Sequence, residues 1–191
     1  MRDRLIGFLL AGSLLATGAL AIGATVSGQL TVSLSLLHQS TNALSTAKET
    51  LPSSFINQTF ATGSGSNQIN QIWYGSRTIA ASGVDNIDIA GGITDSFGTV
   101  VSMMHVRFIA ISATATNSGD IAVGGPVSNG VTIYFGTTND TVRIPPAGAL
   151  LWFCATTSAW SNAVGSADVL QITNRSASIA GYNIYFGGST Q

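Results

Sequence analysis

The longest β-forming stretch of the chain is TVVSMMHVRFIAISA, Thr99–Ala113, and it decides the fold. It is rich in the β-branched and aromatic residues that favour strands, and apolar side chains occupy odd and even positions alike. A strand with one face in water would alternate apolar and polar residues. Because this stretch does not alternate, we expect it to form a central strand of a two-layered β structure with both of its faces covered.

Short β-forming segments flank this stretch, separated by clusters of Gly, Asn, Asp, Ser and Pro at intervals of about 8–12 residues. The predicted strands are 29–36, 69–74, 77–80, 84–89, 120–123, 131–135, 141–144, 149–155, 169–173 and 182–186. Residues 41–51 could form a short helix or a loop, and residues 61–68 have the composition of a loop. The pattern predicts an all-β chain with a single antiparallel β-sandwich. Eight or nine strands favour a jelly roll over a seven-stranded immunoglobulin-like fold.

The N-terminus differs from the rest of the chain. Residues 5–26, LIGFLLAGSLLATGALAIGATV, contain no charged side chain. The candidate anchoring residues are Leu5, Phe8, Leu9, Leu10, Leu14 and Leu15. The segment fits a membrane anchor, a cleaved signal peptide or an arm packed against neighbouring subunits. We therefore divide the chain into an apolar N-terminal segment, residues 1–28, and a β-sandwich domain, residues 29–191.

Charge is scarce. Only 8% of the 191 residues are Asp, Glu, Lys or Arg, against about 25% in ordinary soluble domains. A free protein stays soluble by distributing charge of both signs over its surface. We therefore expect other copies, other proteins or lipid to cover much of this surface. The net charge of −1 argues against a nucleic-acid partner.

Few residues could carry chemistry. His38 and His105 are the two histidines, Cys154 is the single cysteine, and no catalytic or phosphate-binding motif is present. Cys154 lies in an apolar run and is expected to be a buried small side chain. The sequence therefore predicts no enzyme and no cofactor.

Two groups of residues are weaker candidates for binding. Asp85, Asp88 and Asp95 lie close together in the sequence and could bind Ca²⁺, although Asp85-Asn86 also fits a turn. Trp160, in the polar stretch TTSAWSNAVGS, is a candidate contact with a partner.

Several segments together carry a resemblance to a known group of proteins. They are 23–36, IDIAG at 87–91, FG at 97–98, 106–111, IPPAG at 144–148 leading into LLW at 150–152, ADVLQITN at 167–174 and YNIYFG at 182–187. In these segments, from about Gly23 onwards, the chain resembles the small β-sandwich structural proteins of tailed-phage and related virions. The apolar N-terminus departs from their pattern.

The resemblance implies a single jelly roll, located in the virion, that decorates or joins capsid and tail components and has no catalytic residues. Its partners would be copies of itself and other virion proteins, with possible membrane contact through residues 5–26. The alternative is a secreted or membrane-anchored sandwich that recognises glycans through loop aromatics such as Trp160.

Overall fold

The computed structural model describes residues 25–33, 37–41, 46–50, 56–126, 128–132, 134–137, 140–156 and 160–191. Over these residues the chain forms fifteen strands and no helix, so the predicted all-β class is confirmed. The strands are β1 (Gly28–Val32), β2 (Leu37–Thr41), β3 (Thr46–Thr50), β4 (Ile56–Thr62), β5 (Gln68–Ile69), β6 (Gln71–Ile79), β7 (Val84–Asp88), β8 (Ala90–Thr94), β9 (Val100–Ser102), β10 (His105–Ala113), β11 (Ile121–Gly124), β12 (Thr141–Ile144), β13 (Ala149–Phe153), β14 (Val169–Asn174) and β15 (Ala180–Ser189).

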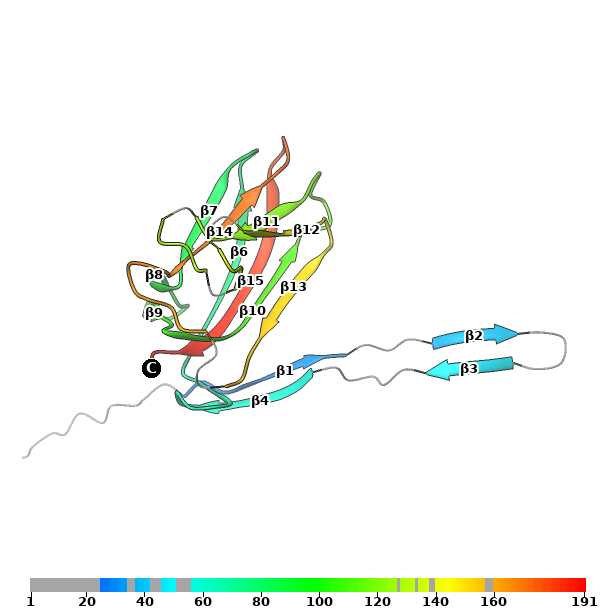
Figure 1. Ribbon diagram of the computed structural model, residues 1–191, viewed down its shortest axis with the longest axis horizontal. Coiled ribbons are helices and arrows are strands. Elements are labelled where there is room, and N and C mark those ends of the chain that lie inside the picture. The colour runs from blue at the N-terminus through cyan, green and yellow to red at the C-terminus, as the bar shows by residue number, and fades with distance from the viewer. Residues whose placement is uncertain are drawn as a thin grey trace, which may run out of the picture.

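Eight of these strands form two four-stranded antiparallel sheets that face each other (Figure 1). Sheet I has the order β13-β10-β15-β6, and sheet II has the order β12-β11-β14-β7. Both contribute to one hydrophobic core, in which Ile109 and Ile184 of sheet I and Ile121 and Ile172 of sheet II are fully buried. We call these two sheets the two-sheet body.

The pairing of the eight strands follows one rule. The first pairs with the last (β6 with β15), the second with the seventh (β7 with β14), the third with the sixth (β10 with β13) and the fourth with the fifth (β11 with β12). One long antiparallel ribbon is therefore folded over on itself. The additional pairings of β10 with β15 and of β11 with β14 join the folded halves into the two sheets.

The stretch Thr99–Ala113 contains two strands, β9 and β10, rather than one. β10 pairs with β13 on one side and with β15 on the other, which makes it an interior strand of sheet I. The central position predicted from its apolar character is confirmed for β10. β9 instead pairs with β8 in a small separate sheet.

The prediction of a helix or loop over 41–51 is wrong for the residues that the structure describes there. β2 and β3 pair in antiparallel register, with Leu37 opposite Thr50 and Thr41 opposite Thr46. Thr41, Thr46 and Thr50 are β-branched and favour an extended backbone, which explains why a polar stretch becomes a strand pair. In the predicted loop over 61–68, the first two residues belong to β4, which continues to Thr62, and Gln68 begins β5.

The prediction of a strand over 131–135 is also wrong for its described residues. The backbone N–H groups of Phe135 and Gly136 both donate to the carbonyl of Thr132, which closes a tight turn. Gly136 has a φ of 86°, a left-handed conformation that glycine adopts without strain. The turn places Tyr134 and Phe135 against Trp152, with ring centroids 5.9 and 5.1 Å from it.

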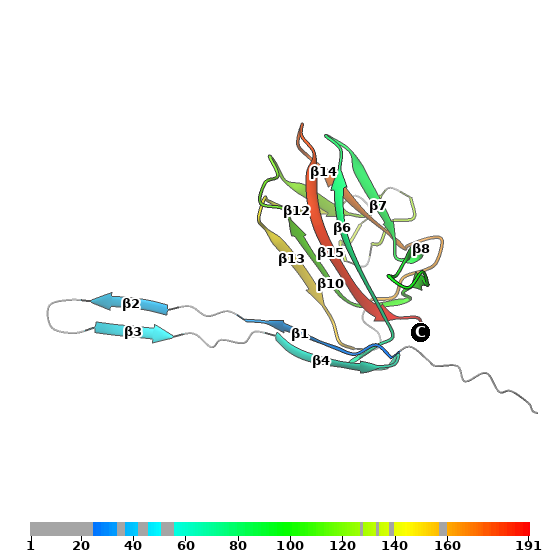
Figure 2. The same ribbon diagram turned by 180° about the vertical axis from the view of Figure 1, so that it is seen from behind.

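Strands β1–β4 form an arm that leaves the two-sheet body. β1 pairs with β4, from Gly28 opposite Phe60 to Val32 opposite Ile56. Figures 1 and 2 show the β2–β3 pair continuing in the direction of β1 and β4, away from the body. We call strands β1–β4 together the arm, and β1 with β4 its base.

Residues 1–24, with the six candidate anchoring leucine and phenylalanine side chains, lie outside the described residues. In the part of the chain that the structure does describe, no helix has the length and apolar character that a membrane crossing requires.

Candidate functional site

The described side-chain contact of His105 is with a serine hydroxyl. His105 begins β10, and its Nδ1 lies 3.1 Å from Oγ of Ser161, with which it also shares a backbone bridge. His38 lies in β2, in the arm. Cys154 is half-buried rather than fully buried, and its Sγ lies 3.4 Å from Oγ1 of Thr156.

The three aspartates proposed as weak calcium ligands each have a separate local role. Asp85 pairs with Arg77, Asp88 accepts a hydrogen bond from the backbone of Ala90, and Asp95 accepts from the backbone of Phe97 and Thr99. The last two are Asx-type turns in which the carboxylate satisfies nearby N–H groups. Among the residues described by the structure, no three His, Cys, Asp or Glu side chains are grouped closely enough to hold a metal ion.

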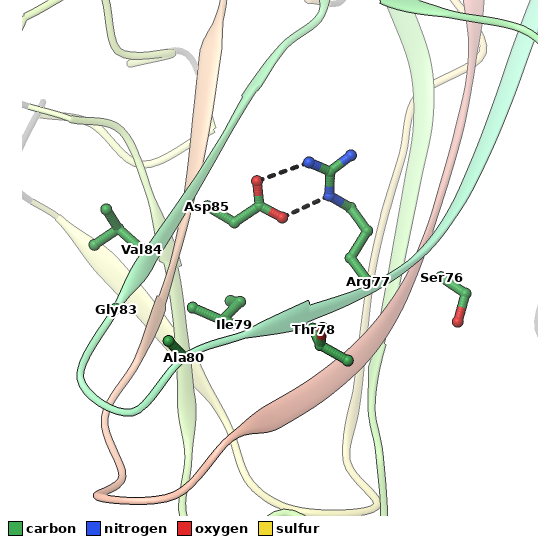
Figure 3. A pocket seen from close by; sticks show the side chains of 8 residues that line it. All are labelled: Ser76, Arg77, Thr78, Ile79, Ala80, Gly83, Val84 and Asp85. Atoms are coloured by element: carbon green, nitrogen blue, oxygen red, sulfur yellow. Dashed lines mark hydrogen bonds and ion pairs between the residues drawn. The ribbon is translucent and has the colours of Figure 1, made fainter.

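Arg77 and Asp85 face each other at a hollow beside the β6–β7 turn (Figure 3). Nε of Arg77 lies 2.5 Å from Oδ2 of Asp85 and Nη2 lies 2.9 Å from Oδ1, so the contact is bidentate. The Tyr182 hydroxyl donates to the same carboxylate at 2.7 Å. Burial, and then the hydrogen bond to Asp85, raise the pKa of Tyr182. The hydrogen bond to Asp85 raises the pKa of Arg77.

This cluster connects the two sheets, because Arg77 and Tyr182 belong to sheet I and Asp85 belongs to sheet II. The three polar groups satisfy one another and offer no reactive group to the hollow. Arg77, Asp85 and Tyr182 therefore hold the edge strands β6 and β7 together, and we call these three residues the clasp.

Trp160 is half-buried, and its ring packs edge-on against Tyr134 with centroids 5.1 Å apart. Trp152 packs against the core, and Trp73 packs on Phe186 while its Nε1 donates to the carbonyl of Thr94. Much of the surface of each tryptophan is therefore used within the molecule.

The most distinctive surface is the outer face of sheet I, the face that points away from the core. Its side chains form rows across the four strands because every second residue of a strand points outward. In the order β13, β10, β15, β6, the rows are Phe153–Phe108–Gly187–Ile72, Leu151–Ala110–Tyr185–Tyr74 and Ala149–Ser112–Asn183–Ser76. These rows contain no charged side chain.

The base of the arm covers part of the first row. Phe60 of β4 is 2% exposed, and its ring packs against Phe108 and Phe153 at 5.8 and 6.2 Å. Gly187 allows this arrangement, because a Cβ there would lie 2.1 Å from the ring of Phe108. An apolar residue of a polar segment is thus buried against a sheet formed by later parts of the chain.

Arg107 fastens the loop that follows the arm. Its guanidinium is buried and donates to the backbone carbonyls of Thr156 and Ser64, the latter at 3.0 Å. Burial lowers the pKa of Arg107. Together with Phe60, these hydrogen bonds fix the base of the arm on sheet I.

The remainder of the outer face is uncovered. Ile72, Tyr74 and Tyr185 are 52%, 54% and 45% exposed, and the two tyrosine rings lie 4.7 Å apart. We call these three residues the apolar patch. A groove with almost entirely apolar walls adjoins it, lined by Tyr185 and Leu151 of sheet I and by Leu30 and Val32 of the arm, among others. Exposed apolar surface of this kind marks sites of interaction with proteins or membranes.

Sequence reasoning did not identify this surface. The signal was present in the β-forming run Thr99–Ala113, where apolar residues on both faces required both faces to be covered. Only the strand pairing shows which residues of β6, β13 and β15 share the outer face with it.

Comparison of the chain with models of protein families, with characterised proteins and with solved structures finds no match.

Proposed function

We propose that this protein is a non-enzymatic structural subunit of a virus particle, a capsid-associated, decoration or tail accessory protein that assembles through its β domain. The observation that carries the proposal is the uncharged outer face of sheet I, with its exposed apolar patch and an arm that projects beyond the body. The exposed apolar patch and the projecting β2–β3 pair are unfavourable in a monomer in water, whereas a subunit of an assembly can bury both against its neighbours.

We further propose that the domain is a single jelly roll. The support is the folded ribbon of eight strands, in which the first pairs with the last and each sheet collects strands from both halves of the ribbon. Eight strands in two sheets built from Greek-key connections define this architecture, which occurs in viral capsid domains and in lectins.

The charged side chains described above support a structural rather than a catalytic role. The ionised groups of the clasp neutralise each other, and the carboxylates of Asp88 and Asp95 accept backbone N–H groups in turns. The alternative of glycan recognition through Trp160 gains no support from the packing of that ring on Tyr134.

The proposal is tested by the mass of the purified full-length protein in solution. Native mass spectrometry and analytical ultracentrifugation over a range of concentrations should show defined oligomers of the 19.5 kDa chain. High salt should not dissociate them, because screening weakens ionic contacts and leaves apolar contacts intact. A chain that stays monomeric at the highest accessible concentration would refute the proposal.

A further inference from the structure

The outer face of sheet I and the arm meet within one chain over only part of the face. Phe60 and the base of the arm cover the end of the face that carries Phe108 and Phe153. The apolar patch of Ile72, Tyr74 and Tyr185 lies beside this contact and is half exposed. We propose that the arm of a second copy of this chain lies across the apolar patch, and that two copies exchange arms. The proposal rests on the proposed assembly function and names the partner surface.

The contact already present within one chain shows how an arm lies on this sheet. Leu30, Val32 and Phe60 point to the same side of the base, and each is less exposed than its neighbours in the sequence. That side faces sheet I, since Phe60 packs on Phe108 and since Leu30 and Val32 line the groove with Tyr185. The groove and the patch therefore continue an existing interface between arm and sheet.

The chain's own arm does not cover the patch. Both views show the β2–β3 pair extending away from the two-sheet body, in line with the base (Figures 1 and 2). A two-stranded hairpin without a further strand or a covered face is at best marginally stable in water. The distal arm therefore requires a surface that its own body does not supply, and an identical neighbour offers such a surface.

The exchange is symmetric. Each copy carries one arm and one patch, so a two-fold axis lets each copy donate its arm and accept the other. Lys48 and Glu49, the charged residues of segment 28–62, are adjacent and opposite in sign, and the outer rows of sheet I carry no charge. Docking the arm on this face therefore brings no like charges of the two copies together.

Two complementary variants of the full-length protein test the exchange. The patch variant carries Ile72→Thr, Tyr74→Thr and Tyr185→Thr, which place a residue that favours strands at each position but remove the apolar patch. The short-arm variant replaces residues 33–55 by an Asn-Gly turn, so that β1 and β4 remain joined as a hairpin. Val84→Thr is the matched control, because Val84 is equally exposed, at 55%, on the outer face of sheet II.

Each variant alone should dissociate, with a dissociation constant for the dimer raised by about 10- to 100-fold. An equimolar mixture of the two variants should form a heterodimer, because the patch variant still supplies an arm and the short-arm variant still supplies a patch. Val84→Thr should associate like the unmodified protein. Native mass spectrometry separates all of these species by mass, and circular dichroism verifies that each variant is folded.

Other outcomes overturn the exchange. A short-arm variant that self-associates normally would show that the faces meet without arms. A patch variant that self-associates normally would show that the patch is not the docking surface, and this result holds even if the short-arm variant fails to fold. If removal of residues 1–24 abolishes association while the short-arm variant retains it, the N-terminal segment and not the arm joins the copies. In these three cases the assembly function stands. Both the assembly function and the arm exchange are refuted only if the unmodified chain is monomeric.

Discussion

The two outer faces of the two-sheet body are built from similar strands but carry opposite chemistry. On sheet I the middle row reads Leu151, Ala110, Tyr185 and Tyr74. On sheet II the row Arg143–Ala122–Thr173–Val84 is followed by Thr141–Gly124–Gln171–Asn86. Gln171 donates to Asn86 at 2.9 Å, and the exposed Arg143 and Thr141 side chains of these rows are polar groups that water can solvate. The difference shows that core packing does not require an apolar outer face, and that sheet I has one for another reason.

The largest effect is expected where the arm joins the apolar face. Phe60→Ala removes a buried ring from between Phe108 and Phe153. It should lower the free energy of unfolding by about 3 kcal/mol or more, through lost burial and the cavity left behind. Urea denaturation measures the loss. Phe97→Ala is the control: Phe97 is 93% exposed, and its replacement should change stability by less than about 0.5 kcal/mol. Equal losses in the two variants would show that the base of the arm is not part of the folded unit.

A smaller effect is expected at the clasp of Arg77, Asp85 and Tyr182, which connects the two facing sheets. Asp85→Asn weakens the bidentate contact with Arg77 and the hydrogen bond from Tyr182. Because the Arg77 side chain is about one third exposed, solvent screening limits the expected loss to about 1–2 kcal/mol. A double-mutant cycle with Arg77→Gln isolates the pair. A coupling free energy of zero would mean that the clasp does not tie the sheets together.

The same clasp predicts a dependence of stability on alkaline pH. The folded pKa of Tyr182 lies above the ordinary tyrosine value of about 10, because burial and the Asp85 carboxylate disfavour the phenolate. Above pH ~10 the unfolded chain loses this proton while the folded chain keeps it, so the free energy of unfolding falls as the pH rises. Below that pH the contribution is complete. Urea midpoints at pH 8 and pH 11 should therefore differ less for Tyr182→Phe than for the unmodified protein. An unchanged difference would contradict this assignment.

The smallest effect on folding is expected on the exposed part of the apolar face. Ile72→Thr should change the free energy of unfolding of the monomer by less than about 0.5 kcal/mol, because half of this side chain is already in water. Oligomerisation should weaken measurably in the same variant. Thermal denaturation at low concentration and sedimentation at high concentration separate the two quantities. A large loss of monomer stability would show that the apolar face serves folding instead of association.

The candidate surface was only partly foreseeable from the sequence. The apolar residues on both faces of 105–113 predicted cover on both sides of β10, and the structure shows the core on one side and Phe60 over Phe108 on part of the other. That partners cover the rest of the exterior, as the scarcity of charge indicated, stays a prediction. Phe60 gave no such signal, since it lies in the polar stretch NQTFAT. Its burial depends on Phe108 and Phe153, which are far away in sequence. Arg107 likewise meets carbonyl groups 43 and 49 residues away, which no local pattern reveals.

Most strands of the two-sheet body follow from the sequence alone, because β-branched and aromatic runs between turn residues favour extended backbone. The turn at 134–136 and the β2–β3 pair did not follow from such runs. The scarcity of charge is also set by the sequence, and it lowers the solubility of any exterior surface that stays exposed to water. Tertiary structure alone decided that two largely apolar rows lie side by side on sheet I. A strand's alternation assigns residues to two faces, but only pairing with distant strands determines which neighbours share a face and what covers them.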